Sequence, residues 1–369
     1  MEATPLVSVV TPFYNTAEYL AECIESVLSQ TYTNWEYILV NNRSTDGSEK
    51  IAQSYVNRFP GRIRLFHTDT FLSQVKNYNF ALSLISPTSK YTKMVQADDL
   101  IFPECLKSMV EVAEAHPQVG IVAGYELEGD HTALNGLPYP RPEVSGREIC
   151  RMNFIDNIPL FGTPTSILMR SEIVRSRTPF YREELWPFED SHACFEALRN
   201  WNYGFVHQVL TYSRRDNESH SISGRIRNFQ MILFIRLSEL VIQGKYYLTE
   251  GEYSACLKKA EHEYFYFLGL AALQGMRNPE FWDWHKKQLA TIGYALNFGF
   301  ISRWMLLVFF DYLGNPKRTF EYLWPRRKRV FAAAIRFIAV FDRFFVRKKS
   351  GENEKHLTPT ESTTVAPNS

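Results

Sequence analysis

The sequence lacks the glycine-rich signatures of two common nucleotide-binding loops. No GxGxxG follows any predicted strand, and no GxxxxGK[ST] occurs in the 369 residues. The first absence leaves a dinucleotide-binding fold of that type unsupported, and the second excludes a P-loop enzyme. A sheet of this chain that binds a ligand must therefore hold it in another way.

Clustered cysteines, strong net charge and long apolar runs are also missing. The five cysteines are scattered and form no CxxC or Cys/His cluster, which argues for a reducing compartment and against structural zinc. The net charge of +1 provides no field that would recruit nucleic acid. No stretch reaches the roughly 18 apolar residues of a membrane-spanning helix, and no signal peptide is expected before Val7. We therefore expect a cytoplasmic protein that does not bind nucleic acid.

Up to about residue 222, the chain alternates short apolar strands with amphipathic helices. Strands are predicted at 6–10, 35–40, 63–67, 91–96, 119–125, 167–169 and 204–212. This alternation predicts an α/β fold, in which a mostly parallel sheet has helices on both faces. The length allows one large domain with an appendage, or two domains.

Polar residues follow two of these strands directly. Asn41 and Asn42 come after 35–40, and Asp98 and Asp99 come after 91–96. Because ligands bind at the carboxyl ends of strands in open α/β sheets, these residues mark a predicted binding edge. Two adjacent carboxylates repel each other unless a cation compensates, and Mg²⁺ favours one or two carboxylates with phosphate oxygens. The alternative is that the acidic pair only caps the helix that begins near Pro103.

After residue 223 the strand pattern stops. Helices are predicted at 225–243, 249–275 and 279–313, so the expected parts are an α/β domain at 1–223 and a helical region at 224–315. A basic amphipathic helix is predicted at 316–349, followed by a disordered tail at 350–369. Its arginine face and its phenylalanine face fit a membrane surface or a protein groove. Alternatively, the apolar face packs on the preceding helices.

Several motifs, taken in order, resemble family 2 inverting glycosyltransferases. They are VSVVTPFYN at 7–15, SVLSQTY at 26–32, STDGS at 44–48, ADD at 97–99 and ED at 189–190. The resemblance covers roughly residues 5 to 222. It implies a GT-A fold, a nucleotide-sugar donor and a divalent cation, Mg²⁺ or Mn²⁺.

The resemblance assigns five residues to the nucleotide and its phosphates. Thr11, Pro12 and Tyr14 would supply backbone groups and an aromatic wall against the base and ribose. Asn42 stands where the family carries an aspartate that accepts a hydrogen bond from the base. An asparagine can accept and donate, which suits uracil or thymine and leaves the base open. Lys76 replaces a common arginine and would neutralise phosphate as a point charge.

The metal motif of the family is Asp-x-Asp, and its first position here is Gln96. Gln96 can bind a ribose hydroxyl but contributes no charge. Asp98, at the third position, is the predicted ligand between the metal and the diphosphate, with Asp99 as its partner or an alternative ligand. Arg214 lies in the segment that closes over the diphosphate in relatives. With one carboxylate fewer, we expect weak metal affinity in the absence of donor.

The resemblance places the general base at Asp190, with Glu189 as a neighbour of open role. Gly162 and Thr163 would border the acceptor cleft. The plainer interpretation of Asp190 is an acid in the first turn of a helix, stabilised by the helix dipole. The two roles are compatible.

These assignments predict an enzyme that moves a sugar from a UDP- or dTDP-sugar to an acceptor hydroxyl with inversion. The acceptor would be a glycan or a lipid-linked molecule in cell-surface glycan or glycolipid synthesis, reached from the inner face of the membrane. Because Gln96 and the Asn41–Asn42 pair depart from the usual acids, another function stays open. The chain would then be a catalytically silent nucleotide-sugar-binding or assembly subunit, docked through its helical C-terminus. The sequence identifies neither the sugar, the acceptor nor the oligomeric state.

Overall fold

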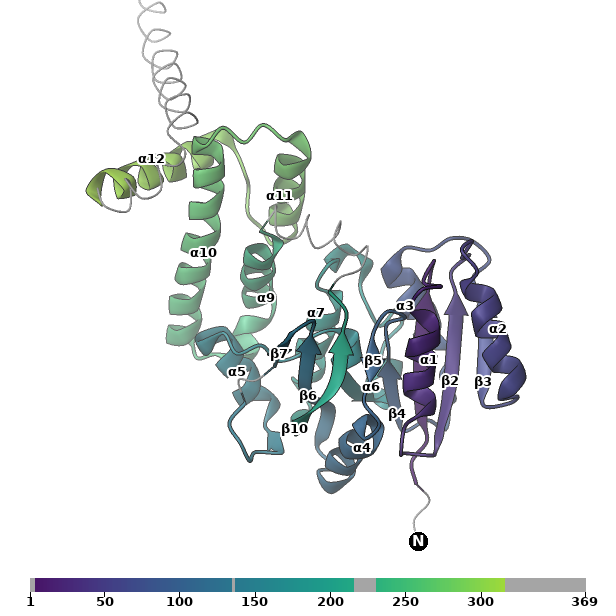
Figure 1. The fold of residues 1–369 in the computed structure, drawn as a ribbon. Helices are drawn as coiled ribbons and strands as arrows, with labels where there is room; N and C mark the ends of the chain where they lie inside the picture. Colours follow the sequence, from purple (N-terminus) through teal and green to yellow (C-terminus); the bar gives the residue numbers. More distant parts are fainter. Residues whose placement is uncertain (1–3, 135–136, 216–229, 316–369) are drawn as a thin grey trace, which may run out of the picture. The chain divides into compact units, whose positions relative to one another are not determined.

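A computed structural model of the chain describes residues 4–134, 137–215 and 230–315. It forms two compact units, of which the first ends at Ala260 and the second begins at Glu261. The first unit holds a mixed ten-stranded sheet flanked by helices (Figure 1), which confirms the α/β prediction. The boundary predicted between 223 and 224, and the segments predicted at 316–349 and 350–369, lie outside the described residues.

The sheet has the strand order β3-β2-β1-β4-β9-β6-β10-β5. Its first half is parallel and consists of β1 (Val7–Phe13), β2 (Trp35–Asn41), β3 (Ile63–His67) and β4 (Tyr91–Met94). Every residue of β1 is buried, as expected for a parallel strand covered on both faces. The second half contains β5 (Leu100–Ile101), β6 (Val119–Glu128), β7 (His131–Ala133), β8 (Glu143–Val144), β9 (Ile167–Arg170) and β10 (Asn202–Ser213).

The sheet is less parallel than the sequence predicts, because β9 runs antiparallel between β4 and β6. The 3-10 helix η1 (Pro164–Ser166) precedes β9 and touches the end of β4, where the Gln96 N–H donates to Thr165 Oγ1 at 3.0 Å. Since β9 starts at the edge where β4 ends, it has to run back in the opposite direction. On the side of β9 away from β4, β6 and β10 pair with each other in parallel.

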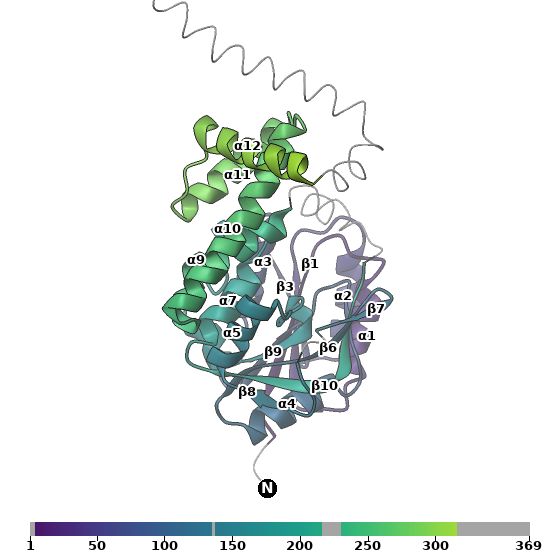
Figure 2. The same cartoon turned by 90° about the vertical axis from the view of Figure 1, so that its left-hand side faces the viewer.

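Helices connect the strands and cover the sheet. They are α1 (Leu20–Leu28), α2 (Ser48–Arg58), α3 (Gln74–Ser83), α4 (Cys105–Ala115), α5 (Gly146–Asp156), α6 (Ser171–Arg175) and α7 (Glu189–Ala197), with the 3-10 helix η2 (Glu183–Leu185) before α7. On α1, the buried Leu20, Ile24 and Val27 recur at helical spacing. α9 (Met231–Tyr247) then packs on α5 and α7 (Figure 2).

The C-terminal helices are α10 (Glu250–Leu273), α11 (Pro279–Thr291) and α12 (Phe298–Gly314). The single helix predicted at 279–313 is therefore wrong. Gly293 has φ +85°, a left-handed conformation that ends α11, and the Asn297 side chain accepts from the Phe300 N–H to begin α12. None of the described helices combines the length and apolarity needed to span a bilayer.

Candidate active site

The candidate site lies where the parallel strands end. In the β-ladders Val10 stands opposite Met94, and Phe13 opposite Asn41, so β1, β2 and β4 end at one edge. Asn42 follows β2 there, and Asp98 follows β4. The predicted common edge is confirmed.

The loops after β1 and β2 are fastened to each other by the STDGS motif. Asp46 accepts hydrogen bonds from the N–H of Ala17 at 2.8 Å and from the N–H of Ser48 at 3.0 Å. The Asn15 N–H donates to Ser44 Oγ at 3.0 Å. The motif therefore shapes the rim of the site by holding the loop that carries Tyr14.

Two aromatic rings stand at this rim. Tyr14 and Phe71 are 44% and 61% exposed, and their rings meet edge to face with centroids 4.8 Å apart. The pair offers the apolar wall predicted from Tyr14. Thr11 and Pro12 are buried, and Thr11 Oγ1 bonds the Tyr37 hydroxyl at 2.9 Å inside the core, so its side chain is not presented to a ligand.

Asn42 is buried and its amide is already engaged. Its Nδ2 donates to the Leu72 carbonyl at 2.9 Å, and its Oδ1 accepts from Thr68 Oγ1 at 3.1 Å and from the Leu72 N–H at 2.9 Å. Because these contacts occupy the Asn42 amide, the geometry does not favour a direct hydrogen bond from Asn42 to the nucleotide base. Instead Asn42 holds the loop that presents Phe71.

Tyr78 of α3 is a central residue that the sequence reasoning missed. Its hydroxyl accepts hydrogen bonds from Gln96 Nε2 at 2.9 Å and Gln74 Nε2 at 2.7 Å. Burial raises the pKa of Tyr78, and the charges of Asp98 and Glu189 raise it further. Both predicted acidic groups therefore lie within electrostatic range of one buried hydroxyl. The helical spacing of Gln74 and Tyr78 is visible in the sequence, but a contact with Gln96 is not.

Asp98 and Asp99 have different environments. The strand β5 follows them, and the N-cap of α4 is Glu104, so the capping alternative is wrong. Asp99 is buried and accepts from Thr165 Oγ1 at 2.5 Å, Ser213 Oγ at 3.3 Å and the Arg214 N–H at 3.2 Å. Burial, with the charge of Asp98, raises the pKa of Asp99 to about 8. Asp98 is half-buried.

The two predicted phosphate-binding cations also differ. Arg214 Nε donates to the backbone carbonyl of Asp98 at 3.3 Å, and its Nη2 pairs with Glu22 at 2.8 Å, which keeps the guanidinium beside the acidic pair. Lys76 Nζ pairs with Glu183 of η2 at 3.1 Å. Ser73 Oγ, at the N-cap of α3, donates to the same carboxylate at 2.5 Å. Ser73 and Lys76 therefore both hold α3 against η2. Of these two cations, only Arg214 contacts the Asp98–Asp99 pair within the part of the chain that the structure describes.

The residues present fit a loosely held divalent ion. No cluster of three or more His, Cys, Asp or Glu side chains that would cage a metal occurs among the described residues. Both Asp99 oxygens accept hydrogen bonds from the protein, which argues against the ligand role predicted for Asp99. Asp98 offers a carboxylate at the edge. This set suits an ion that takes its other ligands from a diphosphate and water.

On the predicted acceptor side, Gly162 is exposed and Thr163 is half-buried. Thr163 Oγ1 donates to Glu126 Oε1 at 2.9 Å. Gly162 has φ +59°, and an added Cβ would collide with the second Glu126 oxygen, which has no hydrogen-bond partner among the described residues. Glu126 is fully buried, so burial raises its pKa. An acid at the end of a predicted strand was the signal that could have identified it.

Glu189 and Asp190 form the first turn of α7. Glu189 is buried and Asp190 is half-buried, and Asp190 Oδ1 accepts from the Ser191 N–H at 2.6 Å. Burial raises the pKa of Asp190 to about 6 and, with the charge of Asp190, that of Glu189 to about 8. Burial and both acids also raise the pKa of Tyr181, whose ring lies 6.3 Å from that of Tyr78. The acids of α7 therefore raise the pKa of both tyrosines, and Asp98 raises that of Tyr78.

The fold and this arrangement define a class, an α/β domain of the GT-A type with acidic side chains at the carboxyl edge of its sheet. Residues 8–178 match the model of Glycosyl transferase family 2. Residues 8–178 therefore form a family 2 glycosyltransferase domain, which confirms the resemblance over that part of the chain. The match includes Asp98 and ends before α7.

Curated relatives agree with this family. The putative glycosyltransferase EpsE of Bacillus subtilis is 35% identical over 41% of this chain and 55% of its own length. Glycosyltransferase GlyG of Streptococcus pneumoniae is 31% identical over 46% of this chain and 58% of its own length. The chain thus spans between half and two thirds of the length of these relatives.

Solved structures share the fold. S. aureus TarS 1-349, solved in complex with UDP-GlcNAc, superposes with a TM-score of 0.57 at 20% identity, over 78% of this chain and 80% of that chain. The mannosyltransferase PcManGT from Pyrobaculum calidifontis, solved with GDP-Man and Mn²⁺, gives 0.51 at 16% identity, over 90% and 87%. At these identities the likeness establishes the GT-A-like fold.

Proposed function

We propose that the protein transfers a sugar from a UDP- or dTDP-sugar to an acceptor hydroxyl, with inversion at the anomeric carbon. One observation carries the proposal: Gln96, two residues before Asp98, donates to the Tyr78 hydroxyl at 2.9 Å, and the charges of Asp98 and of Glu189, beside Asp190 on α7, both raise the pKa of that hydroxyl. The carboxylate expected at the donor end and the acidic pair expected at the acceptor end therefore both influence one buried side chain. The UDP-GlcNAc complex of TarS supports a uridine nucleotide.

Asp190 would take the proton of the acceptor hydroxyl as its oxygen attacks the anomeric carbon. Its pKa of about 6 makes it a stronger base than an exposed aspartate, yet leaves it mostly ionised at pH 7. Glu189, with a pKa of about 8, would stay protonated there and would not compete for the proton. Inversion follows because the oxygen attacks opposite the departing diphosphate.

On the donor side, Asp98 would hold Mg²⁺ or Mn²⁺ together with the diphosphate, and the bound ion would supply positive charge to the leaving group. Arg214 lies beside Asp98 and would add a second positive charge. Tyr14 and Phe71 would pack against the base, and Gln96 would face the ribose. Gly162 and Thr163 would border the acceptor.

A thermal-shift screen of nucleotide sugars, with and without Mn²⁺, tests the donor assignment. We expect a UDP- or dTDP-sugar to raise Tm more than GDP-mannose does, and more with Mn²⁺ than without. Release of nucleoside diphosphate on adding an acceptor glycan or glycolipid would establish transfer. Stabilisation without release from any acceptor would indicate the silent binding subunit, and no stabilisation would overturn both interpretations.

The metal assignment predicts the effect of Asp98→Asn. The variant should lose the Mn²⁺-dependent part of the donor's thermal shift, because the amide brings no charge to the ion, and donor affinity with Mn²⁺ should fall by at least about tenfold. Asp130→Asn, at an exposed acid in the turn between β6 and β7, is the matched control. Tight Mn²⁺ binding to the donor-free protein in calorimetry would contradict the assignment.

We also propose that the protein works on an anionic membrane surface, where it would meet a lipid-linked or cell-surface glycan acceptor from the cytoplasmic side. On α12, Leu307, Phe310 and Leu313 are 46%, 61% and 61% exposed and recur every three residues along one side of the helix. In the sequence directly after α12, residues 316–349 contain eleven Lys and Arg against two Asp and Glu. Apolar side chains next to many basic residues favour anionic lipid.

Co-sedimentation of the full-length protein with vesicles tests this surface. We expect binding to phosphatidylcholine vesicles containing phosphatidylglycerol, little binding to phosphatidylcholine alone, and about tenfold weaker binding of the Phe310→Ser, Leu313→Ser double variant. Tyr139→Ser, at a 79% exposed side chain of the first unit, is the control. Equal binding of the double variant, or a loss of self-association in its place, would contradict the proposal.

A further inference from the structure

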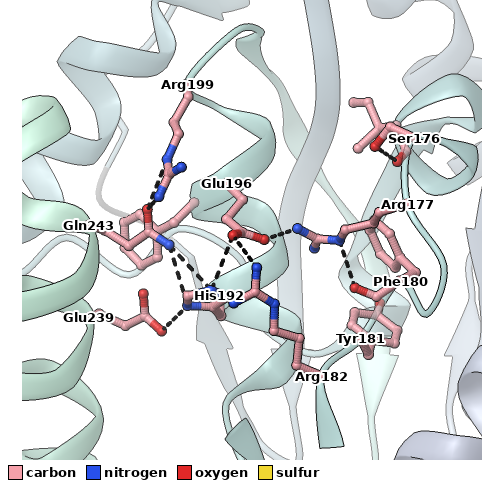
Figure 3. A network of polar contacts seen from close by, with 12 residues as sticks. Ser176, Arg177, Phe180, Tyr181, Arg182, His192, Glu196, Arg199, Glu239 and Gln243 are labelled. Atoms are coloured by element: carbon pink, nitrogen blue, oxygen red, sulfur yellow. Dashed lines mark hydrogen bonds and ion pairs between the residues drawn. The ribbon is translucent and has the colours of Figure 1, made fainter. Parts of the chain in front are cut away.

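A buried ionisable pair joins α7 to α9 (Figure 3). His192 Nδ1 of α7 lies 3.0 Å from Glu239 Oε1 of α9, and the two side chains are 2% and 3% exposed. Gln243 Nε2, one turn further along α9, lies 3.4 Å from the same His192 nitrogen. Burying such a pair is costly, and apolar residues at these positions would dock two helices at least as well. The pair therefore calls for a role other than stability.

Apolar and neutral contacts already fasten the two helices at both ends. Near the start of α7, the rings of Phe188 and Phe234 are 5.9 Å apart. Near its end, the Tyr247 hydroxyl donates to the Phe195 carbonyl. Between these contacts, the His192–Glu239 contact holds the part of α7 that immediately follows Asp190, and the backbone N–H of His192 donates to the Phe188 carbonyl at 3.0 Å.

Carboxylates lie on both sides of His192. Its Nε2 lies 3.5 Å from Glu196, which is ion-paired with Arg177 and, at 3.0 Å, with Arg182 (Figure 3). Glu239 faces His192, and its second oxygen has no hydrogen-bond partner among the described residues. Glu239 is the one carboxylate of α9, and burial raises its pKa while His192 and Arg199 oppose that rise.

We propose that Glu239, acting through His192, is a positioning residue for Asp190, so that α9 completes the active site from outside the residues that match the family model. The proposal rests on the proposed function for the role of Asp190 as the base. α9 supplies this carboxylate from a part of the chain that the family match, which ends at residue 178, does not reach.

The charges around Asp190 predict the direction in which its pKa should change when Glu239 is replaced. Burial raises the pKa of Asp190, and the negative charge of Glu239 raises it further. The other groups that face Asp190 are Glu189 beside it, Tyr181 before η2 and Cys194 one turn further along α7, while His192 and Arg199 face Glu239 itself. Removing the charge of Glu239 should lower the pKa of Asp190. A base with a lower pKa is a weaker proton acceptor, so the rate at neutral pH should fall.

Glu239→Gln in the full-length protein tests the proposal, and Tyr247→Phe is the matched control because it removes a different buried polar contact between the same helices. We expect Glu239→Gln to lower kcat between about 10- and 100-fold with the donor KM unchanged, and to move the acidic limb of the pH profile to lower pH. Glu239→Asp, which restores the charge, should recover part of kcat. Tyr247→Phe should alter Tm but neither the pH profile nor kcat.

Carboxyl ¹³C NMR of aspartate-labelled protein, with the Asp190 signal assigned from Asp190→Asn, measures the same effect without turnover. Its titration midpoint should fall in Glu239→Gln and stay unchanged in Tyr247→Phe. If the wild-type protein transfers sugar but Glu239→Gln keeps its kcat, pH profile and midpoint, this inference is overturned and the proposed function stands. If the wild-type protein transfers nothing, the proposed function fails, and an unchanged midpoint then overturns the inference separately. Equal shifts in both variants would also overturn it.

Discussion

Asp190→Asn is expected to lose nearly all sugar transfer, by about 1,000-fold in kcat, while donor binding is retained. The asparagine has the same shape, and its side-chain oxygen can still accept the Ser191 N–H that Asp190 accepts at 2.6 Å. An amide cannot take the acceptor's proton. The loss should therefore appear in nucleoside diphosphate release with acceptor, and not in the thermal shift that the donor produces.

The pH dependence of the wild-type protein makes the same assignment testable. Burial raises the pKa of Asp190 to about 6, and the base works only when deprotonated, so transfer should rise with pH through about 6 and then level off. Glu184→Gln, at an exposed acid of η2, is the matched control and should keep the wild-type profile. Wild-type turnover in Asp190→Asn would show that another group is the base.

Gly146→Ala is expected to destabilise the first unit by more than about 3 kcal/mol, the largest stability effect that we predict. Gly146 opens α5 against the end of α7, where an added Cβ would collide with the backbone carbonyl oxygens of Leu198 and Trp201. The turn cannot shift freely, because the Ser145 side chain caps it by accepting the Glu148 N–H at 3.2 Å. Backbone atoms yield less readily than the end of a flexible side chain, so the strain should remain.

Thermal unfolding measures this effect, and Tm should fall by at least about 6 °C for a unit of this size. Gly251→Ala is the matched control, since Gly251 also lies in the first turn of a helix, α10, but an added Cβ there meets nothing within 4 Å. Alanine at that position should leave Tm unchanged or raise it slightly. An unchanged Tm in Gly146→Ala would mean that the contact between α5 and α7 is looser than described.

The sequence by itself determined the class of fold and the edge where the site lies. Buried strands such as β1 and β4 are visible as short apolar runs because their hydrophobicity is local. Their parallel order places Asn42 and Asp98 at one edge without further information. Asp190 in the first turn of α7 was likewise predictable, because helix periodicity begins there. These features depend on residues close together in the chain.

Tertiary structure alone decided what each polar side chain contacts. Asn42 hydrogen-bonds the loop that carries Phe71, and both oxygens of Asp99 accept hydrogen bonds from the protein. Lys76 forms an ion pair with Glu183. It also placed Glu239 against His192, which lies 47 residues earlier in the chain. A buried donor or acceptor is satisfied by whichever group the packing brings near it, and such partners follow from the arrangement of whole elements. No periodicity along the chain encodes that arrangement.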